Sequence, residues 1–120
     1  QIPPQAQAKL VRVVRGAVLD IVVDIRRSSS TFGKHVAVEL TAYNGFQLFV
    51  PVGFAHGFCT LEPDTEVAYK VTEFYNPELE RSIAWDDPDL GLPWPIEPGH
   101  AVLSEKDRCA PRLKDSILYF

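Results

Sequence analysis

Several residue types and patterns are scarce or missing in this chain of 120 residues, and each absence excludes a class of protein. No apolar run approaches the roughly 20 residues of a membrane-spanning helix, and the first residues lack the layout of a secretion signal. The two cysteines, Cys59 and Cys109, have no metal-binding spacing and are expected to be reduced. Glycine-rich phosphate loops, Gly-x-Ser-x-Gly elbows and zinc signatures are also missing. We therefore predict a cytoplasmic protein that makes no contact with a membrane.

An excess of basic residues is absent too. The chain has 12 Lys and Arg against 16 Asp and Glu, which gives a net charge of −4 and a pI near 5.3. Because nucleic-acid binders usually present a basic surface, we do not expect a nucleic-acid partner. Methionine is missing altogether, and the chain begins with Gln1. We therefore expect one domain over residues 1–120 that lacks an N-terminal part of the natural protein.

Alternation of apolar and polar residues with a period of two dominates the first 75 residues and is typical of β-strands. In residues 17–26 the odd positions are apolar, while the even positions include Asp20 and Asp24, which predicts a half-buried strand. Residues 9–25 are predicted to form a hairpin about Gly16. Further strands are predicted within 34–41, 46–50, 56–61 and 66–75. Short strands without an amphipathic helix predict an all-β antiparallel barrel or sandwich.

The last third of the chain is less regular. Residues 85–99 are rich in proline, which excludes a long helix and predicts an extended wrap over the barrel. The Ser-x-x-acid pattern of residues 104–107 predicts a short helical turn.

His56 lies in the apolar stretch PVGFAHGF, on the same predicted strand face as Phe54 and Phe58. Such a histidine is either a hydrogen-bonded core residue or part of the lining of a barrel mouth. The Pro-x-Gly-x-x-His spacing also matches the second motif of cupin barrels, in which the histidine is often a metal ligand. A metal site needs three or four convergent ligands, and only His35 precedes this stretch. We therefore expect no metal.

Three further side chains have both a structural and a functional interpretation. Tyr69 shares a predicted face with apolar residues, where its hydroxyl either needs a hydrogen-bond partner or exchanges a proton in a cavity. Lys9 has the parity of Val11 and Val13, so it either points inward towards negative charge or extends back to solvent. Asp107 is either a helix cap or a site carboxylate.

Four long segments follow one another between Gln1 and Pro111, namely AQAKLVRVVRGAVLDIVVDIRRSSSTFGKHVAVELTA, QLFVPVGFAHGF, YKVTEFYNPELERSIAWDDPDLGLPWP and LSEKD. In this order they resemble the dTDP-4-dehydrorhamnose 3,5-epimerases of deoxysugar biosynthesis. The resemblance implies a cupin-like jelly roll without metal or other cofactor, and a homodimer. It also implies a dTDP-4-keto-6-deoxyhexose substrate, epimerised at C3 and C5 as in dTDP-L-rhamnose biosynthesis.

Epimerisation beside a ketone requires a base, donors for the enolate oxygen and an acid on the opposite face. By resemblance Tyr69 is the proton donor, while Lys9 and His56 contact the sugar and favour negative charge on its 4-oxygen. Asp107 would orient the catalytic histidine. Tyr75 would stack on the thymine, and a further residue, Arg108, would help to hold the diphosphate.

One feature departs from the family pattern. The base of the family is a histidine in a Leu-His-Tyr/Phe-Gln segment, whose glutamine corresponds to Gln1, and neither His35 nor His100 matches that position. We therefore expect this chain alone to be inactive or nearly so. The alternative hypothesis is a non-catalytic module of the same fold that binds a sugar nucleotide or another subunit.

Overall fold

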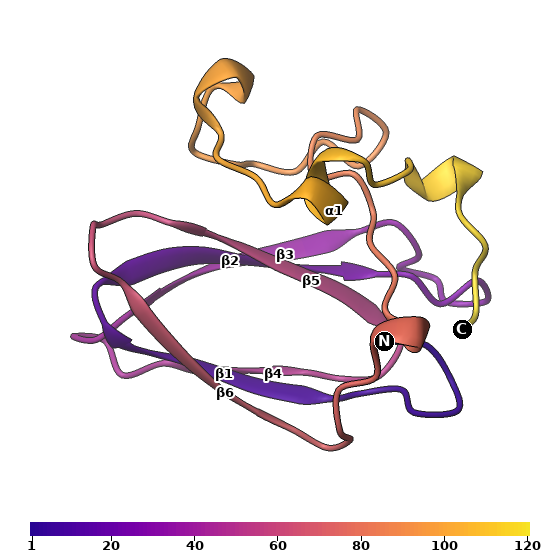
Figure 1. Ribbon diagram of the computed structural model, residues 1–120, viewed down its shortest axis with the longest axis horizontal. Coiled ribbons are helices and arrows are strands. Elements are labelled where there is room, and N and C mark those ends of the chain that lie inside the picture. Colours follow the sequence, from indigo (N-terminus) through magenta and orange to yellow (C-terminus); the bar gives the residue numbers. More distant parts are fainter.

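Two three-stranded antiparallel sheets face each other in the computed structural model, which describes all residues 1–120 (Figure 1). The first sheet has the order β4-β1-β6 and the second β3-β2-β5. The strands are β1 (Lys9–Arg15), β2 (Ala17–Asp24), β3 (His35–Thr41), β4 (Gln47–Val50), β5 (Phe54–Thr60) and β6 (Glu66–Val71). The predicted all-β antiparallel architecture is confirmed, and every strand falls within or close to a segment that the alternation predicted.

The hairpin predicted for residues 9–25 is wrong. β1 pairs with β4 and β6, whereas β2 pairs with β3 and β5, so the chain changes sheets between β1 and β2. Gly16 makes this change of direction with φ of +82°, a conformation that favours glycine. A Cβ atom at Gly16 would lie 2.3 Å from Thr65 Oγ1, so the close approach of the next loop also requires glycine there.

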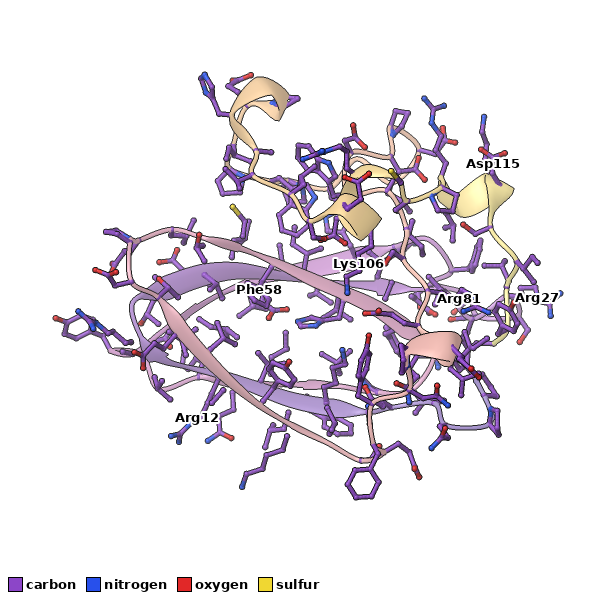
Figure 2. The ribbon with its side chains drawn as sticks, viewed as in Figure 1. Arg12, Arg27, Phe58, Arg81, Lys106 and Asp115 are labelled. Carbon is purple, nitrogen blue, oxygen red and sulfur yellow. The ribbon has the colours of Figure 1, made fainter.

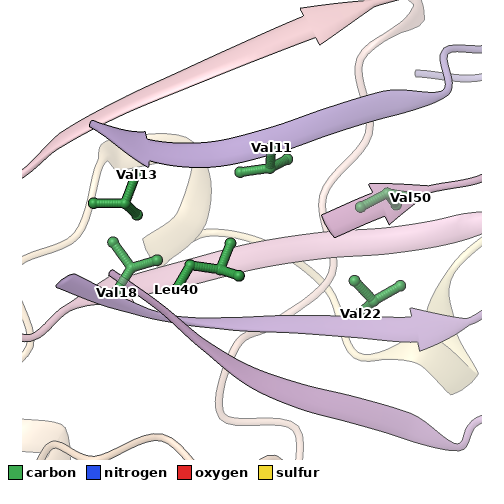
Figure 3. Close-up of a cluster of buried hydrophobic side chains, with 6 residues drawn as sticks. All are labelled: Val11, Val13, Val18, Val22, Leu40 and Val50. Atoms are coloured by element: carbon green, nitrogen blue, oxygen red, sulfur yellow. The ribbon is translucent and has the colours of Figure 1, made fainter. Parts of the chain in front are cut away.

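Strand β2 is buried on both faces, which differs from the half-buried strand that we predicted. Val18 and Val22, at even positions, belong to the core between the sheets, and Ile21, at an odd position, is opposite Gly57, on which Trp94 of the C-terminal segment packs. The core consists of Val11, Val13 and Val50 from one sheet and Val18, Val22 and Leu40 from the other (Figure 3). Burial on the second face has a simple cause, since the chain after β6 folds back over this sheet (Figure 1).

The C-terminal segment is the predicted wrap, and it holds only short helical turns. They are η1 (Pro77–Leu79), η2 (Pro98–His100), α1 (Glu105–Arg108) and η3 (Leu113–Asp115). The ring of Trp94 would lie 3.5 Å from a Cβ at Gly57, so the indole sits directly on β5. Buried Asp87 accepts hydrogen bonds from the backbone N–H groups of Asp89 and Leu113, which ties two parts of the wrap together. None of these helical turns is long and apolar enough to cross a membrane.

Candidate active site

Lys9 and Tyr69 lie on the inner face of the β4-β1-β6 sheet. Val11 is wholly buried in the core and stands directly opposite Tyr69, so the two side chains share a face. Lys9 is two residues before Val11 and opposite core residue Val50, so it points the same way. Burial lowers the pKa of the Lys9 ammonium. The Tyr69 side chain, on an edge strand, is 63% exposed and open to an incoming ligand.

His56 and Asp20 form a close pair on the inner face of the opposite sheet. His56 Nε2 lies 2.9 Å from Asp20 Oδ2, and the side chains are 11% and 0% exposed. His56 is opposite core residue Val22, while Asp20 alternates with Val18 and Val22. The negative charge of Asp20 acts to raise the pKa of Lys9, so these two residues of opposite sheets interact electrostatically. The second carboxylate oxygen of Asp20 is buried and has no hydrogen-bond partner in the protein.

Asp20 is a site residue that the sequence interpretation missed. Its position in the apolar run AVLDIVVDIR was a usable indication, because a buried carboxylate needs a charged or hydrogen-bonded partner. The identity of that partner was not available, since His56 is 36 residues further along the chain.

A second group of side chains, made of Tyr75, Glu80 and Lys106, lies where the wrap meets the end of the barrel. The Tyr75 hydroxyl donates to Glu80 Oε2 at 2.9 Å, and the Lys106 ammonium donates to Glu80 Oε1. The hydrogen bond from Lys106 lowers the pKa of Glu80, and the bond to Glu80 raises the pKa of Lys106 and the pKa of Tyr75. Figure 2 shows Lys106 extending from α1 towards the sheets.

The two groups belong to one electrostatic environment. Glu80 raises, and Lys106 lowers, the pKa of Lys9, so both act on the amine at the start of β1. Sequence interpretation placed Tyr75 and Lys9 in the site but missed Glu80 and Lys106. Neither has a motif of its own, and the pair is separated by 26 residues in the chain.

Asp107 and Arg108 are neighbours on α1 with different surroundings. Ser104 is the helix cap, and its hydroxyl accepts the backbone N–H of Asp107 at 3.3 Å. The carboxylate of Asp107 is therefore not the cap, and it stays half-buried. Arg108 forms a 3.2 Å ion pair with Glu105, and both side chains are largely exposed. Of the two cations on this turn, Lys106 is the one that contacts the site.

Proton transfer is the chemistry that these groups support. An amine, an imidazole paired with a carboxylate, and a phenol line the inside of one barrel and can exchange protons or donate hydrogen bonds to an oxygen that becomes negative. No three His, Cys, Asp or Glu side chains converge into a metal-binding cluster. The fold defines the class, a cupin-like jelly roll, and the side chains on its inner faces are suited to acid–base chemistry.

Comparison with known proteins identifies the family within that class. The family model for dTDP-4-dehydrorhamnose 3,5-epimerase matches residues 1–115. The dTDP-4-dehydrorhamnose 3,5-epimerase of Sinorhizobium fredii is 53% identical over 113 residues, which is 94% of this chain and 57% of that protein. The chain therefore belongs to the dTDP-4-dehydrorhamnose 3,5-epimerase family, and it spans somewhat more than half the length of this relative.

Two solved structures extend the comparison. The epimerase of Legionella pneumophila in complex with dTDP-4-keto-L-rhamnose is 45% identical with a TM-score of 0.90, over 94% of this chain and 60% of that one. A 3'-monoepimerase of Streptomyces bikiniensis in complex with dTDP-quinovose is 40% identical with a TM-score of 0.86, over 95% of this chain and 57% of that one. These likenesses confirm the predicted jelly roll.

Proposed function

We propose that this protein epimerises dTDP-4-dehydro-6-deoxy-D-glucose at C3 and C5 to give dTDP-4-dehydro-L-rhamnose. The observation that carries the proposal is that Lys9 and Tyr69 lie on the inner face of one sheet and the Asp20–His56 pair on the inner face of the other, with the charge of Asp20 acting on Lys9. These groups supply the hydrogen-bond donors and the acid that a reaction through an enolate requires. Family membership supplies the substrate class, since relatives are named as epimerases of this sugar nucleotide.

The proposed mechanism follows from the charges. A base removes the proton next to the ketone, and negative charge moves to the 4-oxygen. The Lys9 ammonium and His56 donate hydrogen bonds to that oxygen, and Tyr69 delivers a proton on the opposite face. Because His56 Nε2 faces Asp20, only Nδ1 is left for the sugar, and both nitrogens donate only in the imidazolium. The buried carboxylate of Asp20 therefore fixes the orientation of the His56 ring and leaves Nδ1 for the 4-oxygen of the sugar.

The nucleotide is proposed to bind at the end of the barrel beside η1. Tyr75 is 64% exposed, which leaves its ring free to stack on a thymine. Lys106 is the cation best placed for the diphosphate, and Arg108, which the resemblance implied, lies next to it on α1. The half-buried Asp107 is proposed to orient the base histidine.

The base is the one role that these residues leave open. His56 is committed to Asp20, and His35 and His100 are exposed. We therefore expect the 120-residue chain to bind dTDP but to exchange little deuterium from D₂O into C3 or C5 of the substrate, as measured by mass spectrometry. Absence of dTDP binding would overturn the proposed ligand, and rapid exchange would contradict the expected need for a further base.

A variant of the complete gene product tests the catalytic assignment. We expect Tyr69→Phe to reduce product formation by about 100-fold or more with little change in dTDP affinity, because only proton delivery is lost. Wild-type turnover in Tyr69→Phe would refute the role of Tyr69. A complete wild-type product that binds dTDP without any exchange would favour the alternative, a non-catalytic binding module.

We also propose that two copies of the protein associate. The outer face of the β4-β1-β6 sheet is not covered by the wrap (Figure 1). Phe49 lies on this face and is 60% exposed, and nearby Phe46 is 58% exposed. Exposed aromatic side chains of this kind mark interaction surfaces. Sedimentation analysis is expected to give a dimer, and a well-folded monomer at micromolar concentration would contradict the proposal.

A further inference from the structure

Polar contacts, more than packing, hold the turn that carries Tyr75 and Glu80. The turn η1 contains no buried residue, and Phe74 just before it is 88% exposed. A segment with so few apolar contacts keeps one conformation only if hydrogen bonds restrain it.

Asn76 is the centre of those hydrogen bonds. Its side-chain oxygen accepts the backbone N–H of Glu78 at 3.1 Å and caps η1. Its amide nitrogen donates to Gln5 Oε1 at 2.8 Å, and its backbone N–H donates to Gln1 Oε1 at 3.0 Å. One asparagine therefore joins the turn to the segment that leads into β1, where Lys9 lies.

The other bonds of this amide cluster, which we define as Gln1, Gln5 and Asn76, lock the same two segments together. Gln1 Nε2 donates to the carbonyl oxygens of Gln5 at 2.6 Å and Phe74 at 3.0 Å. The backbone N–H of Ile2 donates to Leu79 O at 3.0 Å. Tyr75 and Glu80 thus flank a turn whose beginning and end are both hydrogen-bonded to the segment that leads into β1.

We propose that Asn76 is a positioning residue, which through the amide cluster keeps the Tyr75 hydroxyl against Glu80 and presents both to the nucleotide. The inference rests on the proposed function, because Tyr75 serves the nucleotide only if the ligand is a dTDP sugar. Loss of the Asn76 side chain frees the turn, so Tyr75 and Glu80 spend less time together. Nucleotide binding must then also order the turn, and the entropy lost in ordering it lowers the affinity for the nucleotide.

Asn44 offers a matched control. Its side-chain oxygen accepts the backbone N–H groups of Thr41 and Phe46 at 3.1 and 3.0 Å, and its amide nitrogen donates to Glu39 O at 3.0 Å. Asn44→Ala therefore removes three side-chain hydrogen bonds, against two in Asn76→Ala, from a turn that contacts none of the site residues. Gln5→Ala is a milder second variant, which removes one acceptor of Asn76 and leaves the cap of η1 intact.

Two measurements test the inference in the 120-residue chain. The first is the ultraviolet titration of Tyr75, isolated by subtracting the titration of Tyr75→Phe, which needs no ligand. In the wild type the Glu80 carboxylate raises the pKa of Tyr75. We expect the pKa to move back towards the ordinary value of about 10 in Asn76→Ala. The second is dTDP affinity by calorimetry, which we expect to fall about five- to tenfold, as for one lost hydrogen-bonding group.

The outcomes separate this inference from the proposed function. Changes in Asn76→Ala and Gln5→Ala but not in Asn44→Ala support it, and if Asn76→Ala does not fold, Gln5→Ala carries the same test. An unchanged Tyr75 titration, or an equal change in Asn44→Ala, overturns it. A shifted titration in a chain that binds no dTDP refutes the proposed ligand while the positioning role of Asn76 stands.

Discussion

Removal of the His56 side chain is expected to cost more stability than most single substitutions in this protein. Asp20 is 0% exposed, its Oδ2 has only His56 as a partner, and its Oδ1 has none. In His56→Ala the carboxylate would keep no hydrogen-bond partner in the protein. Breaking a buried ion pair by removing one member costs about 3–5 kcal/mol. Because a small domain has a total stability of about 5–15 kcal/mol, this loss is a large and measurable fraction.

The pH dependence of the same variant has a definite sign. A buried carboxylate without a partner is less costly when it carries a proton, so the folded form of His56→Ala binds a proton more tightly than the unfolded chain. Stability then falls as the pH rises. We therefore expect His56→Ala to be more stable at pH 5 than at pH 8 relative to the wild type.

Urea unfolding, followed by the fluorescence of Trp85 and Trp94, measures these differences. The double variant Asp20→Asn/His56→Ala removes the charge as well, so at pH 8 we expect it to be about 1–3 kcal/mol more stable than His56→Ala. His35→Ala, at an exposed position of the same sheet, is the control and should change little. If the double variant is no more stable than His56→Ala, and the latter shows no added pH dependence, the reasoning about the buried charge is refuted.

Three other substitutions test separate features. Gly16→Ala should cost about 1–3 kcal/mol of unfolding free energy, because Gly16 has a φ of +82° and the new Cβ would lie 2.3 Å from the Thr65 hydroxyl oxygen. Gly33 has a similar φ of +76° but open space around it, so Gly33→Ala should cost less. Equal urea midpoints of the two variants would contradict the role of crowding at Gly16. Hydrogen bonds from an arginine and two hydroxyls hold the pKa of Asp24 well below its usual range, so its contribution is complete above about pH 4 and is lost at lower pH. Asp24→Asn should therefore be less stable at neutral pH and flatter in acid titration, and an unchanged acid-unfolding curve would count against this. Lys106→Ala should weaken dTDP binding about tenfold and Arg108→Ala less than twofold in calorimetry, and the reverse order would move the diphosphate site.

Local residue patterns were enough to predict which segments form strands and which side chains share a strand face. Alternation is a local property of the chain, because successive side chains of a strand point to opposite faces. It therefore placed Lys9, His56 and Tyr69 among apolar neighbours on faces that proved to be internal. Proline in the wrap and the serine cap at Ser104 are equally local, and both were recognised without coordinates.

Which strands pair and which side chains meet depends on how distant parts of the chain come together in the fold. The hairpin prediction for residues 9–25 failed because nothing local distinguishes a turn within one sheet from a change between sheets at Gly16. Partnerships that cross the fold were equally out of reach, since Asp20 finds His56, and Glu80 finds Lys106, only after the sheets and the wrap come together. A buried charge needs a partner, and which residue becomes that partner depends on which distant segments the fold brings together.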